Sequence, residues 1–306
     1  MSGTDRAPVA DVTVLTNPAA GHGLAKVYTR RAVERLISRG LRVTVVQGES
    51  AQESAALARD AVAAGADAIV AAGGDGLVSL VLNVIAQTGT PLAILPSGTG
   101  NDHARLFGIP VGDPVAAADI IIDGPVRSID LGRVGQTWFG TVLASGFDSL
   151  VTDRANRMRW PRGPMRYNLA MLAELANLKP LPFRIELDDR TIELDAALVA
   201  VGNGSTYGGG MRICPDAVVD DGLLDITVVA AGGRMRLVRL FPTVYKGTHV
   251  RLPEVQTFRS RTVRLSNPGL TGSPITAYAD GERLAPLPVT VEVVPDAARV
   301  MVAPGH

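Results

Sequence analysis

The sequence predicts an α/β protein of two domains: an N-terminal parallel-sheet domain and a C-terminal, mainly antiparallel β-sandwich. Residues 12–122 alternate short apolar runs with helix-like segments, which is typical of parallel strands joined by crossover helices. From about residue 126 the pattern changes to strands joined by turns. The chain has 306 residues, 46% of them hydrophobic, which is enough for two cores. We place the domains at 1–125 and 126–306, with the last strand returning to the first domain.

The N-terminal elements follow from the apolar runs and from the glycines that end the helices. Gly40 and Gly65 each follow an expected helix, as is usual just beyond a helix C-terminus. The predicted strands are 12–16, 42–47, 67–72 and 91–95. The predicted helices lie near 23–39, 51–64 and 76–87, with a short helix from Asp102.

The C-terminal elements are mostly strands with turn residues between them. The predicted strands are 126–134, 137–145, 181–188, 191–202, 223–230, 255–266, 274–280 and 288–294. Helices are expected near 164–178 and 234–246. No internal repeat or low-complexity segment interrupts this pattern.

Composition excludes several classes of protein. The formal net charge is zero, so nothing in the whole-chain charge favours a nucleic-acid partner, and we expect none. A single cysteine, Cys214, excludes an internal disulfide and a cysteine-based zinc site. No run approaches the ~18 apolar residues of a membrane span, and the N-terminus lacks an apolar signal core. The expected location is therefore cytoplasmic.

Three glycine-rich loops carry the chemistry of the first domain. They are Asn17–Gly21, Gly73–Gly76 and Leu95–Asp102, and each comes at the end of a predicted strand. Open α/β sheets bind ligands at the carboxyl ends of their strands, and glycines let backbone N–H groups approach an anion. The three loops together predict a site for a nucleotide polyphosphate.

Two common phosphate-binding signatures are missing from these loops. There is no Gly-x-x-x-x-Gly-Lys-Ser/Thr segment, and the Gly74-Asp75-Gly76 run lacks the third glycine of the dinucleotide fingerprint. Asp75 and Asp102 each open a predicted helix, so either carboxylate can be a helix cap or a ligand for Mg²⁺, ribose or water. Both roles stay open on the residues alone.

The order of the motifs resembles the diacylglycerol kinase catalytic-domain family, which includes bacterial lipid kinases and sphingosine kinases. The resemblance covers nearly the whole chain. Its segments, beyond the loops above, are Gly98–Arg105, Gly146–Asp148, Val201–Gly204, Tyr207–Met211, Pro215–Ala217, Asp220–Asp225, Gly247–His249 and Asp280–Glu282.

The resemblance implies that ATP binds in a cleft between the domains and that its γ-phosphoryl group passes to a lipid hydroxyl. The expected reaction converts diacylglycerol to phosphatidic acid at a membrane surface, with ATP and Mg²⁺ as cofactors. The implied partners are ATP and a membrane-embedded lipid, through peripheral contact, and a homodimer stays open.

The resemblance also implies roles for individual residues. Glu282 is the expected catalytic base, with Asp102 as a second catalytic residue, although a solvated turn glutamate is the alternative. A structural Mg²⁺ is expected on Asp221 and the backbone carbonyls of Val218 and Leu223. The expected ATP-binding residues are Asn17, Pro18, Gly21, Gly73, Gly74, Asp75, Gly76, Ser79, Gly98, Thr99 and Asn101.

Some positions depart from the family pattern. Threonine, asparagine and glutamate usually follow the Gly-Gly-Asp-Gly segment where this chain has Leu77, Ser79 and Leu80, and phenylalanine usually stands at His103. Two rival functions remain. One is an NAD kinase-like phosphotransferase, because NAD kinase shares the Gly-Gly-Asp-Gly loop. The other is a weakly active regulator that binds a nucleotide or lipid, which Leu77 and Leu80 suggest.

A cluster of arginines around Trp160 is the candidate membrane-docking surface, because arginine and tryptophan suit a membrane interface. The alternative is a solvated loop followed by a core-facing helix. The arginines are Arg154, Arg157, Arg159, Arg162 and Arg166.

Overall fold

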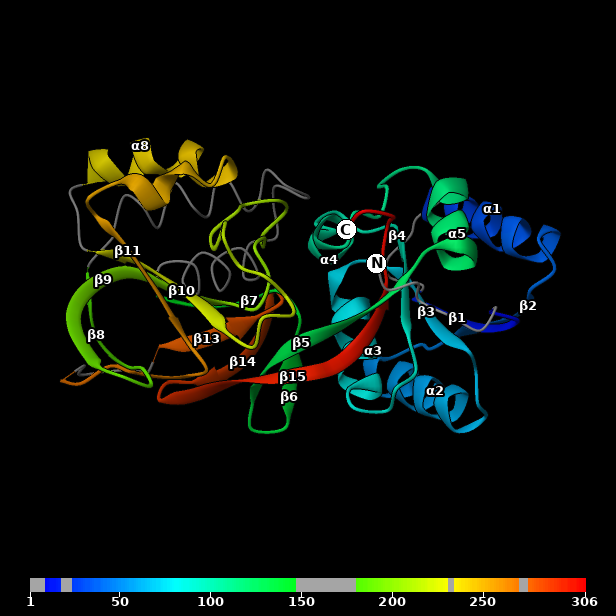
Figure 1. Ribbon diagram of the computed structural model, residues 1–306, viewed down its shortest axis with the longest axis horizontal. Coiled ribbons are helices and arrows are strands. Elements are labelled where there is room, and N and C mark those ends of the chain that lie inside the picture. Colours follow the sequence, from blue (N-terminus) through cyan, green and yellow to red (C-terminus); the bar gives the residue numbers. More distant parts are fainter. Residues whose placement is uncertain (1–8, 18–23, 147–179, 231–233, 270–274) are drawn as a thin grey trace. The chain divides into compact units, whose positions relative to one another are not determined.

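A computed structural model describes residues 9–17, 24–146, 180–230, 234–269 and 275–306 (Figure 1). The chain divides into two compact units, which we describe in turn. The first unit is Met1–Leu131 together with Pro295–His306, and the second is Gly132–Val294. The predicted helix at 164–178 and the arginine cluster around Trp160 lie outside the described residues.

The first unit is built on a parallel sheet, as predicted. Its strand order is β2-β1-β3-β4, and the bounds are β1 Asp11–Thr16, β2 Arg42–Gln47, β3 Ala68–Gly73 and β4 Leu92–Pro96. The end of β15 (Val289–Met301) joins this sheet, where Val300 pairs with Leu92 in parallel. The carboxyl ends of β1, β3 and β4 therefore lie along one edge, and the glycine-rich loops follow them.

Helices cover both faces of this sheet (Figure 1). On one side α1 (Leu24–Ser38) packs with α5 (Pro114–Asp123), and on the other α2 (Ala51–Ala63) packs with α3 (Asp75–Ile85). A further helix of this unit, α4, is short and spans Asp102–Leu106. All six residues of β3 are buried, which explains its continuous apolar sequence.

The second unit is a β-sandwich with one connected network of strands. The path runs β14-β13-β7-β9-β8-β12-β15, while β10 pairs with β9 and β11, and β6 pairs with β5. The bounds are β5 Val126–Val134, β6 Thr137–Phe139, β7 Val142–Gly146, β8 Leu181–Glu186, β9 Thr191–Gly202, β10 Leu224–Ala230, β11 Val255–Ser260, β12 Thr262–Ser266, β13 Thr276–Ala279 and β14 Glu282–Pro286.

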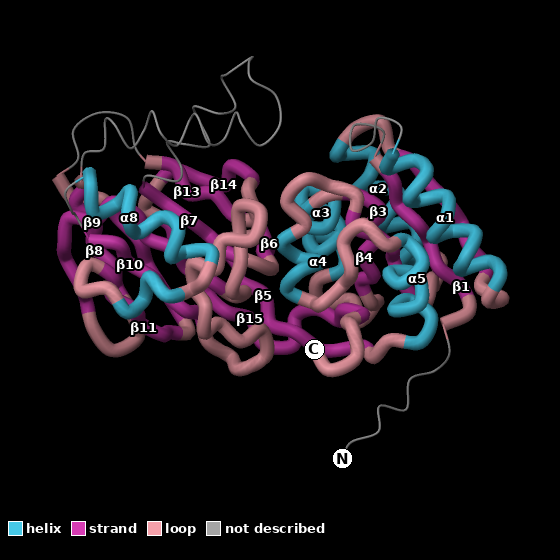
Figure 2. Tube along the Cα trace, turned by 90° about the horizontal axis from the view of Figure 1, so that it is seen from above, coloured by secondary structure: helices cyan, strands magenta, loops and turns pink. Residues whose placement is uncertain are grey.

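The long strand β9 organises this sandwich. Its first half pairs with β8, and its second half lies between β7 and β10. Side chains such as Phe183, Val201, Ile226 and Val291 fill the interior between the strands. Helix α8 (Arg234–Tyr245) lies over the strands of this unit (Figure 2). Leu240 and Val244 of α8 belong to a second buried apolar cluster. A 3-10 turn, η2 (Thr248–Arg251), follows α8.

Several elements differ from the sequence prediction. The expected strands 137–145 and 255–266 are each two strands, because turns interrupt them at 140–141 and at Arg261. Helix α5 and strand β14 were not predicted. Among the described residues, no helix is long and apolar enough to cross a bilayer.

Candidate active site

Two of the glycine-rich loops touch each other at the carboxyl edge of the parallel sheet. A Cβ atom built on Gly98 would lie 2.4 Å from the Cα of Gly74, and one built on Gly74 would lie 3.1 Å from the Cα of Gly98. Side-chain atoms do not approach backbone so closely, so this contact requires glycine at position 98 and leaves little room at position 74. The loops after β3 and β4 thus form one continuous backbone surface.

Asp75 lies at the centre of this surface, and its carboxylate is held by His103. Oδ1 of Asp75 accepts a hydrogen bond from the backbone N of His103 at 3.1 Å and lies 3.2 Å from its Nδ1. Partial burial favours the protonated carboxyl, but these contacts outweigh it and hold the pKa of Asp75 below its usual range. The carboxylate is therefore ionised at neutral pH.

The carboxylate of Asp75 does not cap its own helix, α3, although it accepts from the N of His103 in the first turn of α4. The N-cap of α3 is Gly74, which forms no side-chain cap bond. Oδ2 of Asp75 instead lies where it would meet a Cβ on Gly100 at 2.5 Å, so the loop passes directly over the carboxylate. The side chain of Asp75 is still 19% exposed, which leaves it accessible to a ligand.

Asn101 braces the third loop from within. Its backbone is left-handed, with φ of 56°. Its side-chain Oδ1 accepts from the N of Gly98 at 3.0 Å, and its Nδ2 donates to the O of Gly98 at 2.8 Å. The amide of Asn101 is thus engaged with its own loop, whereas Thr99 and Gly76 are exposed at the surface.

Asp102 follows as the first residue of α4. It is 5% exposed, and its Oδ1 lies 3.6 Å from Nη1 of Arg105. Arg105 also donates to the carbonyl of Gly100. The predicted residues Asp75, Gly98, Thr99, Asn101 and Asp102 are therefore brought together in one loop cluster.

Leu77 has a packing role at the position where the family has a polar residue. Its side chain is buried, and its Cδ2 would lie 2.8 Å from a Cβ on Gly73. Ser79, one of the predicted ATP-binding residues, is 9% exposed within α3. In α3, the position after Gly76 is therefore filled by a buried apolar side chain that packs beside Gly73.

A cavity of about 480 Å³ lies beside the loops, between α1 and the sheet. Asn17 lines it, as the sequence predicts for the nucleotide site, whereas Pro18 and Gly21 lie outside the described residues. Ser97 also lines it, from the third predicted loop. The sequence did not mark the other polar residues that line the cavity, which are Thr16, Lys26, Thr29, Arg30 and Gln47.

In the second unit, Asp280 and Gly281 form the turn that presents Glu282. Both turn residues have positive φ, 50° and 82°, as the preferred two-residue hairpin turn requires. Glu282 follows at the start of β14 and is exposed. Its carboxylate is therefore accessible to a substrate.

Asp280 anchors this turn to the segment between β6 and β7. Its carboxylate accepts hydrogen bonds from the N of Gly140 at 3.0 Å, the N of Thr141 at 2.8 Å and the hydroxyl of Thr141 at 2.6 Å. Asn203 donates to the O of Gly140 at 3.1 Å, and its backbone N donates to the O of Thr141 at 2.9 Å. The motifs at 201–204 and 280–282 thus both form hydrogen bonds to residues 140–141.

The predicted metal ligand Asp221 is already engaged. Its Oδ1 accepts from the N of Leu223 at 3.1 Å, and its other oxygen pairs with Arg259. Among the described residues, no cluster of three or more His, Cys, Asp or Glu side chains is arranged for a metal. Carboxylate and carbonyl oxygens suit Mg²⁺ chemically. A cation here has to compete with the guanidinium of Arg259, however, so this donor set does not fit Mg²⁺ as arranged.

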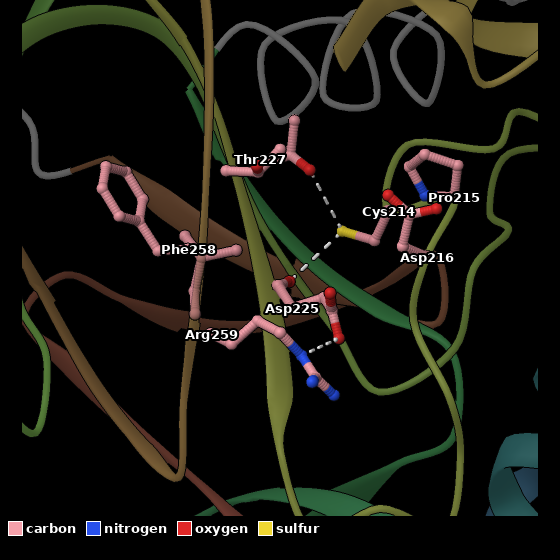
Figure 3. Close-up of a pocket in the computed structure, with 9 residues that line it drawn as sticks. Cys214, Pro215, Asp216, Asp225, Thr227, Phe258 and Arg259 are labelled. Atoms are coloured by element: carbon pink, nitrogen blue, oxygen red, sulfur yellow. Dashed lines mark hydrogen bonds and ion pairs between the residues drawn. The ribbon is translucent and has the colours of Figure 1, made fainter. Parts of the chain in front are cut away.

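A pocket of about 280 Å³ is lined by Arg259, the residue that pairs with Asp221 (Figure 3). It contains Cys214, whose Sγ contacts the O of Asp225 at 3.3 Å and the hydroxyl of Thr227 at 3.5 Å. Burial raises the pKa of Cys214 to about 12, so the thiol is inert, and burial also raises the pKa of Asp225. The buried, neutral thiol of Cys214 is therefore not placed as a nucleophile.

Comparison with known proteins identifies the family. Residues 11–134 match the diacylglycerol kinase catalytic domain, and residues 141–302 match the YegS C-terminal NAD kinase beta sandwich-like domain. The chain belongs to the diacylglycerol kinase family. Members of this family are kinases, so the protein is an enzyme of the transferase class.

Individual relatives agree with this assignment. A diacylglycerol kinase from Mycobacterium tuberculosis is 51% identical over 97% of this chain and 96% of its own length. One from Bacillus subtilis is 26% identical over 83% and 84%. A crystal structure described as a diacylglycerol kinase from Bacillus anthracis has the same fold, with a TM-score of 0.73 and 21% identity over 96% of this chain and 97% of its own.

Proposed function

We propose that the protein transfers the γ-phosphoryl group of ATP to the hydroxyl of diacylglycerol and so forms phosphatidic acid. The observation that carries this proposal is the contact between Gly74 and Gly98, which joins two loops into one backbone surface around Asp75. Family membership supports the same reaction, because the relatives are named diacylglycerol kinases.

The loop cluster suits a polyphosphate. Phosphoryl transfer depends mainly on positioning and on neutralising charge. Backbone N–H groups at the start of α3, which has 11 residues, point toward the carboxyl edge of the sheet, where the helix dipole favours an anion. We assign the phosphates of ATP to Gly73, Gly74, Gly76, Gly98 and Thr99.

The carboxylates of Asp75 and Asp102 would repel phosphate unless a cation lies between them. Mg²⁺ supplies that charge when it accompanies ATP, and carboxylate oxygens are its usual ligands. Asp75 suits this role because it is ionised and partly exposed. The structural Mg²⁺ expected at Val218, Asp221 and Leu223 is not part of this proposal, because Arg259 already pairs with Asp221.

Glu282 is proposed as the general base. Its carboxylate takes the proton from the lipid hydroxyl while that oxygen attacks the γ-phosphorus, and the bond from this phosphorus to the β,γ-bridging oxygen breaks. ADP leaves with the electron pair of that bond. A positioned base typically contributes ~10²–10⁴-fold to the rate. The hydrogen bonds that hold Asp280 fix the turn that carries Glu282.

The proposed acceptor sits in a membrane, so we propose that the enzyme acts from the cytoplasmic side by peripheral contact. A direct test incubates the protein with labelled ATP, Mg²⁺ and vesicles that contain diacylglycerol. Labelled phosphatidic acid is the expected product. Parallel reactions with a total lipid extract and with NAD⁺ separate other acceptors: a labelled NADP⁺ product would replace this proposal with the NAD kinase-like alternative, which the named relatives do not favour.

Nucleotide binding is tested separately from turnover. Mg·ATP should raise the melting temperature of the parent protein, because a ligand of the folded state stabilises it. Asp75→Asn should reduce that shift, whereas Asp60→Asn, an exposed residue on α2, should not. If Mg·ATP raised the melting temperature of all three proteins equally, Asp75 would not be part of the nucleotide site. Binding without turnover on any lipid would favour the regulator alternative.

A further inference from the structure

Three aspartates surround the turn at 219–222, which leads into β10. Asp221 lies in the turn, Asp225 is the second residue of the strand, and Asp216 belongs to the segment before the turn. Asp216 and Asp225 line the same pocket (Figure 3). The charges of Asp221 and Asp216 both act against an ionised carboxylate at Asp225. Like charges placed so closely need a cation between them.

Arg259 of β11 supplies one cation to two of these carboxylates. Strands β10 and β11 are antiparallel, and Arg259 lies directly opposite Asp225. Its Nε lies 3.4 Å from Oδ2 of Asp225, and its Nη2 pairs with Oδ2 of Asp221. Because the guanidinium is planar and carries several N–H donors, one group bridges both carboxylates. The turn and the start of β10 are thereby tied to β11.

The bridge is less exposed to water at its carboxylates than at its cation. The side chain of Asp225 is 13% exposed and that of Asp221 is 28% exposed, whereas that of Arg259 is 46% exposed. Among the described residues, Oδ2 of Asp225 has no hydrogen-bond partner, so the ion pair with Arg259 compensates its charge. A partly buried carboxylate that loses such a partner costs more stability than a solvated one.

A metal ion at this turn would need the same oxygens. The resemblance implies Mg²⁺ on Asp221 and on the carbonyls of Val218 and Leu223. Here Oδ1 of Asp221 accepts from the N of Leu223 at 3.1 Å, and Oδ2 pairs with Arg259. Since Mg²⁺ demands a close shell of oxygen ligands, it would have to displace the guanidinium. The two cations are therefore alternatives at this position.

We infer that Arg259 supplies the positive charge for which the family resemblance implies a structural Mg²⁺, so that the turn at 219–222 is held without a metal. The inference concerns the second unit alone and goes beyond the proposed reaction. The Mg²⁺ proposed to accompany ATP is a separate ion. Two measurements test the inference, and neither contains nucleotide.

The first measurement removes metal from the protein. Melting temperatures of the parent in EDTA and in millimolar Mg²⁺ should agree within ~1 °C, because an ion that the folded state does not bind cannot stabilise it. Asp221→Asn is measured in the same two solutions. A rise with Mg²⁺ in the parent that Asp221→Asn abolishes would place the metal on Asp221 and overturn the inference. A rise of equal size in both proteins would place the metal elsewhere and leave the inference standing.

The second measurement removes the guanidinium. Arg259→Met should lower the melting temperature in EDTA by ~3–8 °C, because it leaves Asp225 and Asp221 uncompensated. Mg²⁺ should recover part of this loss, since no guanidinium then competes for the carboxylates. Arg261→Met is the matched control, because Arg261 is an exposed arginine between β11 and β12, and it should melt like the parent. Arg259→Lys keeps the charge on a single ammonium and should lie between the parent and Arg259→Met.

The outcomes decide the inference independently of the proposed function. Equal melting temperatures for the parent, Arg259→Met and Arg261→Met would show that Arg259 does not hold the turn. If Mg²⁺ does not stabilise Arg259→Met, or stabilises it equally after the further change Asp221→Asn, the guanidinium does not stand in a cation position and the inference is wrong. Should Arg259→Met fail to fold, the first measurement decides. A parent protein that binds no ATP would remove the proposed function and leave this inference intact.

Discussion

The carboxylate of Asp280 accepts two hydrogen bonds from Thr141, one from its backbone N at 2.8 Å and one from its hydroxyl at 2.6 Å. These residues are 139 positions apart in the sequence. The bonds fix the turn before Glu282 to the segment before β7, so the position of the proposed base depends on a buried carboxylate that takes no part in the chemistry.

We therefore expect Asp280→Ala to destabilise the protein by about 2–4 kcal/mol, because it leaves buried donors of Gly140 and Thr141 without an acceptor. Asp280→Asn should cost less, since asparagine keeps one oxygen acceptor and tolerates the left-handed backbone. Urea unfolding measures both free energies. Equal stability of the alanine variant and the parent would contradict the anchoring role.

Glu282→Gln should bind ATP normally and lose most of its phosphoryl transfer. The substitution keeps the size of the side chain but removes the basic carboxylate, so kcat should fall by ~10²–10⁴-fold. Arg283→Gln changes the neighbouring exposed charge on β14 and serves as the control. A Glu282→Gln rate within a few-fold of the parent would leave Glu282 as a turn residue only.

Gly98→Ala should disrupt the loop contact. The new methyl group would lie 2.4 Å from the Cα of Gly74, and backbone atoms cannot give way as a flexible side chain can. We expect a loss of stability of about 2–3 kcal/mol and at least tenfold weaker ATP binding. Gly89→Ala is the comparison, because Gly89 has positive φ but no atom within 4 Å of its added Cβ.

The Gly89 variant should lose about 1 kcal/mol for its left-handed backbone and bind ATP like the parent. Thermal unfolding and ATP titration of the two variants give the comparison. Similar ATP affinities in both would show that the contact between Gly74 and Gly98 is not needed for the nucleotide.

The parallel sheet was predictable because its strands are short apolar runs and glycines follow the helices between them, which is a local pattern. Helix α5 has equally local signals that the prediction did not use. Asp113 accepts hydrogen bonds from the N atoms of Val115 and Ala116, and Pro114 occupies the first turn. Strand β14 has no such signal, because its residues are mostly exposed, its apolar and polar residues do not alternate, and only its pairing with β13 defines it.

The site was predictable where a motif names its residues and not where side chains meet across the chain. The resemblance marks Asp75, Asp102 and Glu282. It does not reveal that Thr141 donates hydrogen bonds to Asp280, or that Lys26 lines a cavity. The engagement of Asn101 with Gly98 was also hidden, since the same amide in a sequence equally suits a ligand. Such roles depend on tertiary contacts that composition and spacing do not encode.

His103 is the position where the family usually has phenylalanine, and here its ring holds Asp75. We expect His103→Phe to fold but to raise the KM for ATP by ~10-fold, because the carboxylate loses the contact at 3.2 Å that orients it. His103→Asn can still donate from near the Nδ1 position and should recover much of this loss. If both variants keep the parent KM while kcat falls equally, His103 does not act through Asp75.

His249 should make stability depend on pH. It is fully buried, and its Nε2 contacts the O of Ile213 at 3.0 Å. Burial lowers the pKa of His249 below its ordinary value of 6.5, so the folded state keeps the ring neutral. The unfolded chain binds a proton first as the pH falls below about 6.5, and its extra proton favours unfolding. The stabilisation is therefore complete above pH 6.5 and is lost progressively as the pH falls toward the lower pKa of the folded state.

The corresponding test uses His249→Gln, in which the side-chain amide can replace the Nε2–H donor to Ile213. Its free energy of unfolding should change less between about pH 7 and pH 5 than that of the parent. His306→Gln, at an exposed terminal residue, should keep the parent's dependence. Urea unfolding at half-unit pH steps gives the three curves, and parallel curves for the parent and His249→Gln would assign the acid sensitivity to other groups.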